Sequence, residues 1–310
     1  MQDINLFIHD QLSAWEEARL RYEALKDVRI RELIVEGIPY RVQFNPARIV
    51  SSAAKVDAKS LSERPCFLCA KNRPKEQRAI DFEGRYDILV NPFPIFARHL
   101  TIVSKWHEPQ SLRREAGRQD RQQSGSRLCD MMALAKALPD FTIFYNGAKC
   151  GASAPDHMHF QAVGRGELPL EQMAVKPRYA RVIELKATDS CEDLLNPEPM
   201  VNLLMYYNPQ DADEENTDGQ DADRQGTDEQ NADAQKADGQ KADAQERWTL
   251  IVLERKKHRP DCYYAEGKKQ LLCSPASVDL GGVFVLPREE DFEKITAKDI
   301  KQILSECCKE

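Results

Sequence analysis

Apolar and polar side chains alternate over residues 157–161, whose one-letter sequence is HMHFQ. Alternation with a period of two is typical of a β-strand, in which successive side chains point to opposite faces of the sheet. We therefore expect Met158, Phe160 and Ala162 to face a hydrophobic core. The other face then carries three polar side chains that can bind a metal, attack phosphorus or donate a hydrogen bond to phosphate: His157, His159 and Gln161.

Further apolar runs predict strands elsewhere in the chain. Residues 30–46 are an expected hairpin around Gly37, and the runs at 200–208 and 247–255 are two expected strands on either side of a polar segment. Four more strands are predicted at residues 86–93, 99–106, 140–147 and 281–287.

Helices are predicted near both ends of the chain and in its middle. Residues 1–29 are acidic and amphipathic, with an apolar stripe that fits a helix: Leu6, Phe7, Leu12, Trp15 and Leu20. Residues 291–308 predict a second amphipathic helix with four apolar residues on one side: Ile295, Ile300, Ile303 and Leu304. A loop and a helix are expected over 108–138. Strands and helices without regular βαβ alternation favour an α+β fold with an antiparallel sheet.

Residues 209–246 form an acidic segment with a repeat of five residues. It contains 13 Asp or Glu and 3 Lys or Arg, a net charge of −10, so the rest of the chain carries +3 of the formal −7. The segment has too few apolar residues to offset chain entropy, and we expect a disordered insert. It is either a solvated hairpin extension without a function or a contact for a partner.

Composition narrows the class of protein. The mildly basic remainder suits a small ligand that carries phosphate and lacks the strongly basic face of a nucleic-acid binder. No apolar run reaches the roughly 18 residues of a membrane span, and the N-terminus lacks the pattern of a secretory signal. Nine cysteines, an odd number, favour reduced thiols in the cytoplasm over a disulfide framework. We therefore expect a cytoplasmic protein with no nucleic-acid or membrane partner.

Cys66 and Cys69 have the C-x-x-C spacing of a zinc site. Two thiolates in one turn can bind a single zinc, which needs two further ligands. His107 and His157 are the available histidines at strand ends, so these four residues are the predicted metal ligands. A redox pair or an accidental spacing is the alternative. His99 is expected to cap or to pack, whereas His9 and His258 are expected to have no role at the site.

His159 is the candidate nucleophile. A neutral imidazole can attack phosphorus and form a phosphoramidate, provided that its other nitrogen keeps a proton that a backbone carbonyl can accept. Gln161 is expected to donate its amide to a phosphate oxygen. The small residues of the loop at 146–155 would let backbone N–H groups approach phosphate, and an ordinary turn is the alternative. The loop supplies four candidate substrate contacts: Asn146, Lys149, Gly151 and Ser153.

Three segments, at 66–69, 90–110 and 144–162, resemble the transferase branch of the histidine-triad (HIT) superfamily. The first and last are similar to galactose-1-phosphate uridylyltransferases. The middle segment and the C-terminal region are similar to diadenosine tetraphosphate phosphorylases, which are also called ATP adenylyltransferases. The HMHFQA sequence also resembles plant GDP-L-galactose phosphorylases. The similarity covers about residues 35–305 without the acidic insert.

The resemblance implies a HIT-like antiparallel sheet with helices, in two related halves. The N-terminal helix at 1–29 would precede a catalytic half at 30–180 and a second half at 181–310 that contains the insert. By position, the same four Cys and His residues would bind zinc, His159 would carry the nucleotide beside Gln161, and Ser153 would contact phosphate. Candidate substrate contacts in the second half are Lys256, Lys257 and Ser277.

The chain also departs from the uridylyltransferase pattern. Its loop, SAPDHMH, is one residue longer than SNPHPH, with Asp156 before the first histidine and Met158 in place of proline. The chain combines sequence motifs of three sister families, so the resemblance does not identify the substrate.

The identity of residue 161 distinguishes hydrolysis from nucleotidyl transfer or phosphorolysis. Histidine-triad hydrolases have a histidine at this position, whereas an amide cannot shuttle a proton. We therefore expect a nucleotidyltransferase or phosphorylase that cleaves a nucleoside diphosphate sugar or a dinucleoside polyphosphate through a nucleotidyl-histidine. Inorganic phosphate or a sugar phosphate would be the acceptor. The alternatives are a nucleotide hydrolase and a zinc-stabilised nucleotide-binding module without activity. A homodimer is a candidate assembly.

Overall fold

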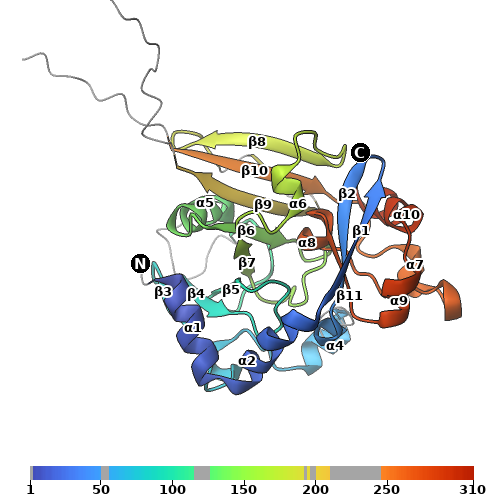
Figure 1. Ribbon diagram of the computed structural model, residues 1–310. Helices are drawn as coiled ribbons and strands as arrows, with labels where there is room; N and C mark the ends of the chain where they lie inside the picture. Colours follow the sequence, from blue (N-terminus) through green and yellow to red (C-terminus); the bar gives the residue numbers. More distant parts are fainter. Residues whose placement is uncertain (1–2, 50–55, 115–125, 192–193, 196–199, 210–245) are drawn as a thin grey trace, which may run out of the picture.

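The computed structural model describes residues 3–49, 56–114, 126–191, 194–195, 200–209 and 246–310 (Figure 1). Most of the predicted acidic insert, residues 210–245, lies outside these ranges. Among the described residues, no helix combines the length and the apolar character that a bilayer crossing requires.

An eight-stranded sheet forms the centre of the molecule, and every neighbouring pair in it is antiparallel. Figure 1 shows its full width, from β3 and β4 at one edge to β8 at the other. In spatial order its strands are β3 (Ile80–Phe82), β4 (Tyr86–Val90), β5 (His99–Ser104), β7 (His159–Gly164), β6 (Phe141–Asn146), β9 (Val201–Asn208), β10 (Arg247–Glu254) and β8 (Ala180–Lys186).

The two parts of the chain on either side of residue 180 share this sheet through β6 and β9. Ile143 pairs with Met205 and Asn146 pairs with Asn202. The apolar runs predicted at 200–208 and 247–255 are β9 and β10, which are antiparallel neighbours. Residues 210–245 therefore connect two adjacent strands.

A second, three-stranded sheet has the order β1 (Arg29–Val35), β2 (Ile38–Phe44) and β11 (Val283–Leu286). The predicted hairpin is β1–β2, and both turn residues, Glu36 and Gly37, have positive φ. A two-residue turn with two positive φ angles matches the twist of a hairpin, which explains glycine at position 37. β11 joins β2 in parallel, so this sheet is mixed.

Alternation along the strands of the large sheet gives it two different faces. Met158, Phe160 and Ala162 are fully buried in one hydrophobic cluster, as predicted. Helices α1 (Ile4–Ala14) and α5 (Arg127–Ala137) contribute to that cluster. The opposite face packs through Phe144 and Ile251 into a second cluster, which holds the small sheet and three C-terminal helices: α8 (Ser277–Leu280), α9 (Glu289–Lys294) and α10 (Ala297–Cys307).

Shorter helices connect these layers: α2 (Glu16–Glu23), α4 (Ala58–Glu63), α6 (Pro169–Gln172) and α7 (Asp261–Tyr264). Four 3₁₀ turns complete the described elements: η1 (Ala24–Asp27), η2 (Pro46–Arg48), η3 (Ala70–Asn72) and η4 (Gly267–Lys269).

Both predicted terminal helices are broken in two. At the N-terminus, Trp15 leaves the helical conformation between α1 and α2, so the predicted stripe does not continue, and Leu6 and Leu20 are exposed. At the C-terminus, Thr296 caps α10 by accepting the N–H of Asp299. That capping box starts a new helix after α9. The residues predicted on the apolar side are all buried: Ile295, Ile300, Ile303 and Leu304.

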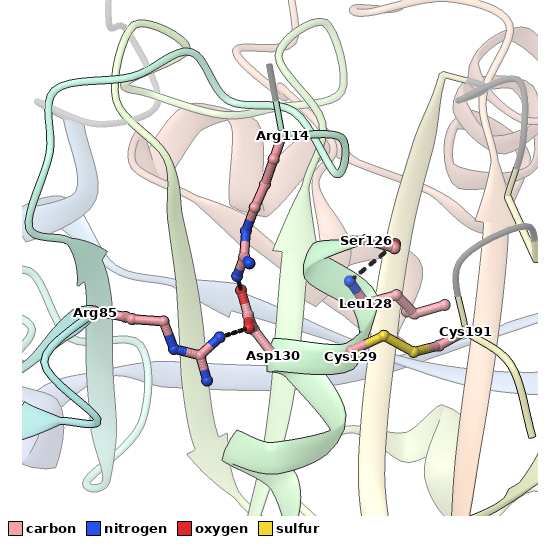
Figure 2. Close-up of a disulfide and its surroundings, with 7 residues drawn as sticks. All are labelled: Arg85, Arg114, Ser126, Leu128, Cys129, Asp130 and Cys191. Carbon is pink, nitrogen blue, oxygen red and sulfur yellow. Dashed lines mark hydrogen bonds and ion pairs between the residues drawn. A yellow bond between two sulfur atoms is a disulfide. The ribbon is translucent and has the colours of Figure 1, made fainter. Parts of the chain in front are cut away.

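One cysteine pair corrects the expectation of reduced thiols. Cys129 of α5 and Cys191, which follows β8, form a disulfide, whereas the other seven cysteines are free (Figure 2). The pair is 62 residues apart, and no spacing rule links such distant cysteines before the fold is known. Beside the disulfide, Asp130 is paired with Arg85 and Arg114, which ties α5 to the segment before β4.

Candidate active site and metal centre

Strands β5 and β7 bring two histidines to one end of the large sheet. The strands are antiparallel neighbours, so the end of β5 lies beside the start of β7. Ser104 donates its N–H to the carbonyl of Met158 at 2.9 Å and extends this pairing. His107 follows β5 and His157 precedes β7, and their ring centroids are 5.2 Å apart.

A turn before η3 places Cys66 and Cys69 at the same end. The Cys69 N–H donates to the carbonyl of Cys66 at 3.3 Å. Arg73 donates to the carbonyl of Leu68 at 2.8 Å and forms a 2.7 Å ion pair with Asp87 of β4. Arg73 therefore anchors the cysteine turn to strand β4 of the large sheet.

The four predicted metal ligands converge. Cys66 Sγ lies 3.3 Å from His157 Nδ1, Cys69 Sγ lies 3.4 Å from His107 Nδ1, and all four ligand atoms are within 4.8 Å of one another. Sulfur and nitrogen ligands of tetrahedral zinc are about 3.5 Å apart, from bonds of about 2.3 and 2.0 Å. His157 donates from Nε2 to the carbonyl of Ser104 at 2.8 Å, which leaves Nδ1 as the ligand atom. The donor set fits a metal.

His159, the predicted nucleophile, has one ring nitrogen bonded and one directed elsewhere. Its Nδ1 lies 2.8 Å from the carbonyl of His157 and donates to it, so Nε2 keeps the lone pair. The side chain is 4% exposed, and burial lowers the pKa of His159 to about 4 against the opposing effect of that hydrogen bond. The imidazole is therefore neutral at neutral pH.

Gln110, a residue to which the sequence assigned no role, fixes the backbone of His159. Its amide oxygen accepts the His159 N–H at 2.8 Å, and its Nε2 donates to the carbonyl of His159 at 2.9 Å. The same Nε2 donates to the carbonyl of Asn146 at 2.9 Å. Gln110 thus bridges β7 and β6 beyond their last paired residues, Phe144 and Gln161.

A cavity of about 470 Å³ lies against the face of the large sheet that carries Phe144, a volume in the usual range of small-ligand sites. His159 and Gln161 both line it. His157 does not, because its ring points to the two cysteines. The predicted row of three polar residues is thus divided between the Cys₂His₂ cluster and the cavity. The cysteine turn contributes Phe67 and Leu68 to the cavity wall.

The loop predicted as a phosphate cradle forms part of the same wall. Asn146, Gly151 and Ser153 line the cavity, whereas Lys149 is exposed and outside the lining. Gly151 has a φ of +94°, and a Cβ there would lie 2.6 Å from the Cβ of Ala276. Only glycine lets the loop approach this segment so closely.

The second half reaches the cavity through residues other than those predicted. Lys256 is exposed, Lys257 pairs with Glu306 at 3.6 Å, and Ser277 is fully buried against the Asn146 side chain. None of the three lines the cavity. His258 and Arg259 do, together with Arg48 from the segment after β2. Single basic residues without periodic spacing give no sequence signal, which is why they were missed.

The half-buried Arg48 and the buried Asp279 contribute opposite charges to the cavity lining. Burial lowers the pKa of Arg48 to about 10, partly offset by Asp279, so its guanidinium stays protonated at neutral pH. Burial raises the pKa of Asp279 to about 6, against hydrogen bonds from the N–H groups of Ala276 and Val285. Arg259 adds a further cation and donates to Ser274 at 2.9 Å. This composition suits an anionic ligand.

Arg255, which directly follows β10, connects several segments that pack beside the cavity lining through buried hydrogen bonds. It is 1% exposed and donates to Asn202 Oδ1 at 2.8 Å. Asn202 in turn donates to Asn146 Oδ1 at 2.7 Å and to the carbonyl of Cys150 at 2.8 Å. Four backbone carbonyls accept the other hydrogen bonds of the guanidinium: Lys257, His258, Pro275 and Cys307.

Solved structures with this fold include three crystal structures of yeast Ap4A phosphorylase Apa2, each 15% identical to this chain and matched over 99% of it. The complex with Ap4A has a TM-score of 0.51 over 98% of that chain. The complex with AMP has a TM-score of 0.50 over 98%, and the structure without a named ligand has 0.50 over 95%. A comparison with curated proteins gives no match.

Fold and site together define an α+β protein with a HIT-like antiparallel sheet, as the resemblance implied, and a Cys₂His₂ cluster beside a buried histidine. The family model described as "Domain of unknown function (DUF4922)" matches residues 7–164, slightly more than half of the chain. The chain belongs to this family. The matched region contains the Cys₂His₂ cluster and the strand of His159.

Proposed function

We propose that this protein is a nucleotidyltransferase of the phosphorylase type that works through a nucleotide bound covalently to His159. The observation that carries the proposal is the orientation of its ring. The Nδ1 proton is held by the carbonyl of His157 at 2.8 Å, and the side chain faces the cavity that Gln161 also lines. The likeness of the fold to an Ap4A phosphorylase supports this class of reaction.

In the first step, the lone pair of His159 Nε2 attacks the α-phosphorus of the donor. A P–N bond forms, and the bond from phosphorus to the bridging oxygen breaks with its electron pair on the leaving phosphate. The positive charge that develops on the ring is stabilised by the Nδ1–H bond to the carbonyl. Gln161 would donate its amide to an oxygen of the phosphoryl group.

In the second step, an oxygen of inorganic phosphate or of a sugar phosphate attacks the same phosphorus. The P–N bond breaks, its electron pair returns to Nε2, and the imidazole is neutral again. The acceptor is already an anion and needs no base. This agrees with an amide at position 161, because an amide cannot activate water by removing a proton.

The preferred donor is a dinucleoside polyphosphate, with a nucleoside diphosphate sugar as the second choice. The Apa2 complexes contain AMP and Ap4A, and those ligands guide this choice for the present chain. The cavity offers Arg48 and Arg259 for a polyphosphate. Ser153 and the backbone of Gly151 are proposed phosphate contacts in the loop.

Zinc is the metal that we propose for the Cys₂His₂ cluster, because two thiolates and two imidazoles complete a closed tetrahedral site. In such a site the metal supplies rigidity and no open coordination position for chemistry. His157 binds through Nδ1 and holds the start of β7, so the metal would fix the strand that carries His159.

The test uses donors labelled in the transferred nucleotide, such as diadenosine tetraphosphate, UDP-glucose and GDP-hexose, without an acceptor. Acid-labile label should stay on the wild type and be absent from His159→Ala. The exposed His9, with a side chain 77% accessible, gives the control His9→Ala, which should keep the label. Label that survives His159→Ala would refute the assignment of the nucleophile.

A second measurement separates the alternatives. Turnover of the donor should require added phosphate or sugar phosphate. Full-rate turnover in water alone would identify a hydrolase. Nucleotide binding without label or turnover on any donor would identify a binding module.

A further inference from the structure

Beside Gln161 lies a fully buried histidine that does not itself line the cavity. His99 is 0% exposed, and its Nε2 is 3.0 Å from Gln161 Oε1. Asn91 Nδ2 is 3.3 Å from the same oxygen. The sequence predicted that His99 would cap or pack, and it did not predict this contact with Gln161.

The proton on His99 can be placed from its other nitrogen. The backbone N–H of Ile95 points to Nδ1 at 3.2 Å, so Nδ1 must accept. In a neutral ring, Nε2 then carries the hydrogen and donates to Gln161 Oε1. Burial lowers the pKa of His99 to about 3, with a further decrease from Arg48 and an opposing effect of Gln161, so the ring is neutral.

The orientation of Asn91 is fixed in the same way. Its Oδ1 accepts the N–H of Phe93 at 2.8 Å, which directs Nδ2 to the other side. There Nδ2 donates to Thr101 Oγ1 at 2.9 Å and has its second hydrogen toward Gln161 Oε1. Two donors therefore meet one amide oxygen.

This arrangement excludes the flipped amide of Gln161. With Nε2 in place of Oε1, the amide hydrogens would face the N–H of His99 and the amide of Asn91, donor against donor. Leaving such a buried group unsatisfied costs roughly 1–3 kcal/mol. Because His99 and Asn91 both donate to Gln161 Oε1, the Nε2 atom of the amide is the one available to a ligand in the cavity.

We propose that His99 is a positioning residue, which fixes the Gln161 amide so that its N–H groups face the phosphoryl group transferred to His159. The inference rests on the proposed function for its kinetic consequence. The hydrogen-bond arrangement itself does not depend on any activity. His99 touches no reacting atom and acts only through Gln161.

The kinetic test is a double-mutant cycle on the rate of His159 labelling. His99→Phe keeps a planar ring but removes the donor, and His99→Gln keeps an amide donor near the position of Nε2. We expect His99→Phe to slow labelling roughly tenfold to a hundredfold, with AMP affinity within about twofold of wild type, and His99→Gln to recover most of the rate.

Because His99 acts through Gln161, His99→Phe should have no further effect in a Gln161→Ala background. Rate losses that multiply would overturn the proposal, since they would indicate an independent structural effect of the substitution. An unchanged rate in His99→Phe would overturn it as well. Thermal melting of each variant reports whether the fold is retained.

A second measurement needs neither a variant nor turnover. Long-range ¹H–¹⁵N correlation spectra of the wild type should show His99 as one neutral tautomer with its hydrogen on Nε2. A hydrogen on Nδ1 would overturn the positioning role. If the wild type takes no label from any donor while this tautomer is found, the proposed function fails, but the hydrogen bond by which His99 orients Gln161 is still supported.

Discussion

At the scale of single side chains, the sequence predicted some of the residues that line the cavity and missed others. The alternation at 157–161 predicted His159 and Gln161 on one side of a strand, and both line the cavity. The sequence analysis expected a hydrogen bond from the His159 ring to a backbone carbonyl, but it did not identify His157 as the acceptor. Such a bond depends on backbone conformation, which the identities of neighbouring residues do not specify.

Gly151 gives the sharpest prediction at this scale. Gly151→Ala forces a side chain into a φ of +94° and against Ala276, so the loop must move away from the segment at 275–276. We expect a loss of roughly 2 kcal/mol in unfolding free energy and a roughly tenfold weaker affinity for AMP. Urea unfolding and equilibrium binding would measure the two effects.

Gly37 provides the control, because it has a φ of +83° with nothing within 4 Å of an added Cβ. Gly37→Ala should show the backbone cost alone and unchanged AMP affinity. Equal affinities in the wild type and in Gly151→Ala would contradict the role of this loop as a cavity wall.

At the scale of elements, the sequence predicted most strands and misplaced the ends of the helices. Strands β1, β2, β4, β5, β6, β9 and β10 follow from apolar runs with turn residues between them. The parallel pairing of β11 with β2 has no local signal, because it joins residues about 240 positions apart. The break between α9 and α10 did have a local signal, because Thr296 and Asp299 have the spacing of a capping box.

Asp291 of α9 provides a pH-dependent prediction about element packing. It is fully buried, pairs with Arg288 at 2.6 Å and Lys294 at 2.8 Å, and accepts the N–H of Leu272 at 2.9 Å. Burial alone would raise its pKa, but these hydrogen bonds outweigh burial and hold the pKa of Asp291 below the ordinary 3.8. Asp291→Asn should therefore lower the unfolding free energy at pH 7 by roughly 3 kcal/mol.

The sign of the pH effect follows from a depressed pKa in the folded state. The stabilisation is fully present above about pH 4, where the unfolded carboxyl is also ionised, and is lost as the pH falls through the folded pKa. The difference between wild type and Asp291→Asn in urea unfolding should shrink toward pH 3. Glu290→Gln, at an exposed partner of Arg288, should have little effect at either pH. A difference that persists in acid would rule out the carboxylate charge as its source.

At the scale of the whole molecule, the Cys₂His₂ cluster brings together three segments that are far apart in sequence: the cysteine turn, the end of β5 and the start of β7. The sequence predicted its four members because C-x-x-C limits the search and few histidines end strands. It did not predict the cavity-lining cations, because Arg48 and Arg259 meet only after both sheets have packed.

Removal of the proposed metal should therefore destabilise both the fold and the strand that carries His159. Purified wild type should contain about one zinc per chain, and the Cys66→Ser/Cys69→Ser variant should contain none. We expect its melting temperature to fall by roughly 6–12 °C, the shift for a loss of about 3 kcal/mol in a domain of this size class. Cys262→Ser, at a free thiol outside the cluster, should keep its metal. Equal metal in all three proteins would remove the zinc assignment.

The bond between Cys129 and Cys191 makes the chain between them a covalent ring that contains β6, the cradle loop and β7. In the chain-entropy model, closing a loop across a sequence separation of 62 raises the free energy of the unfolded ensemble by about 4 kcal/mol. Asn146, His159 and Gln161 all belong to this ring. The part of the molecule on which the proposed transfer depends is thus the part whose denatured form is most restricted, and one polypeptide has two folding equilibria according to the oxidation state of two sulfur atoms.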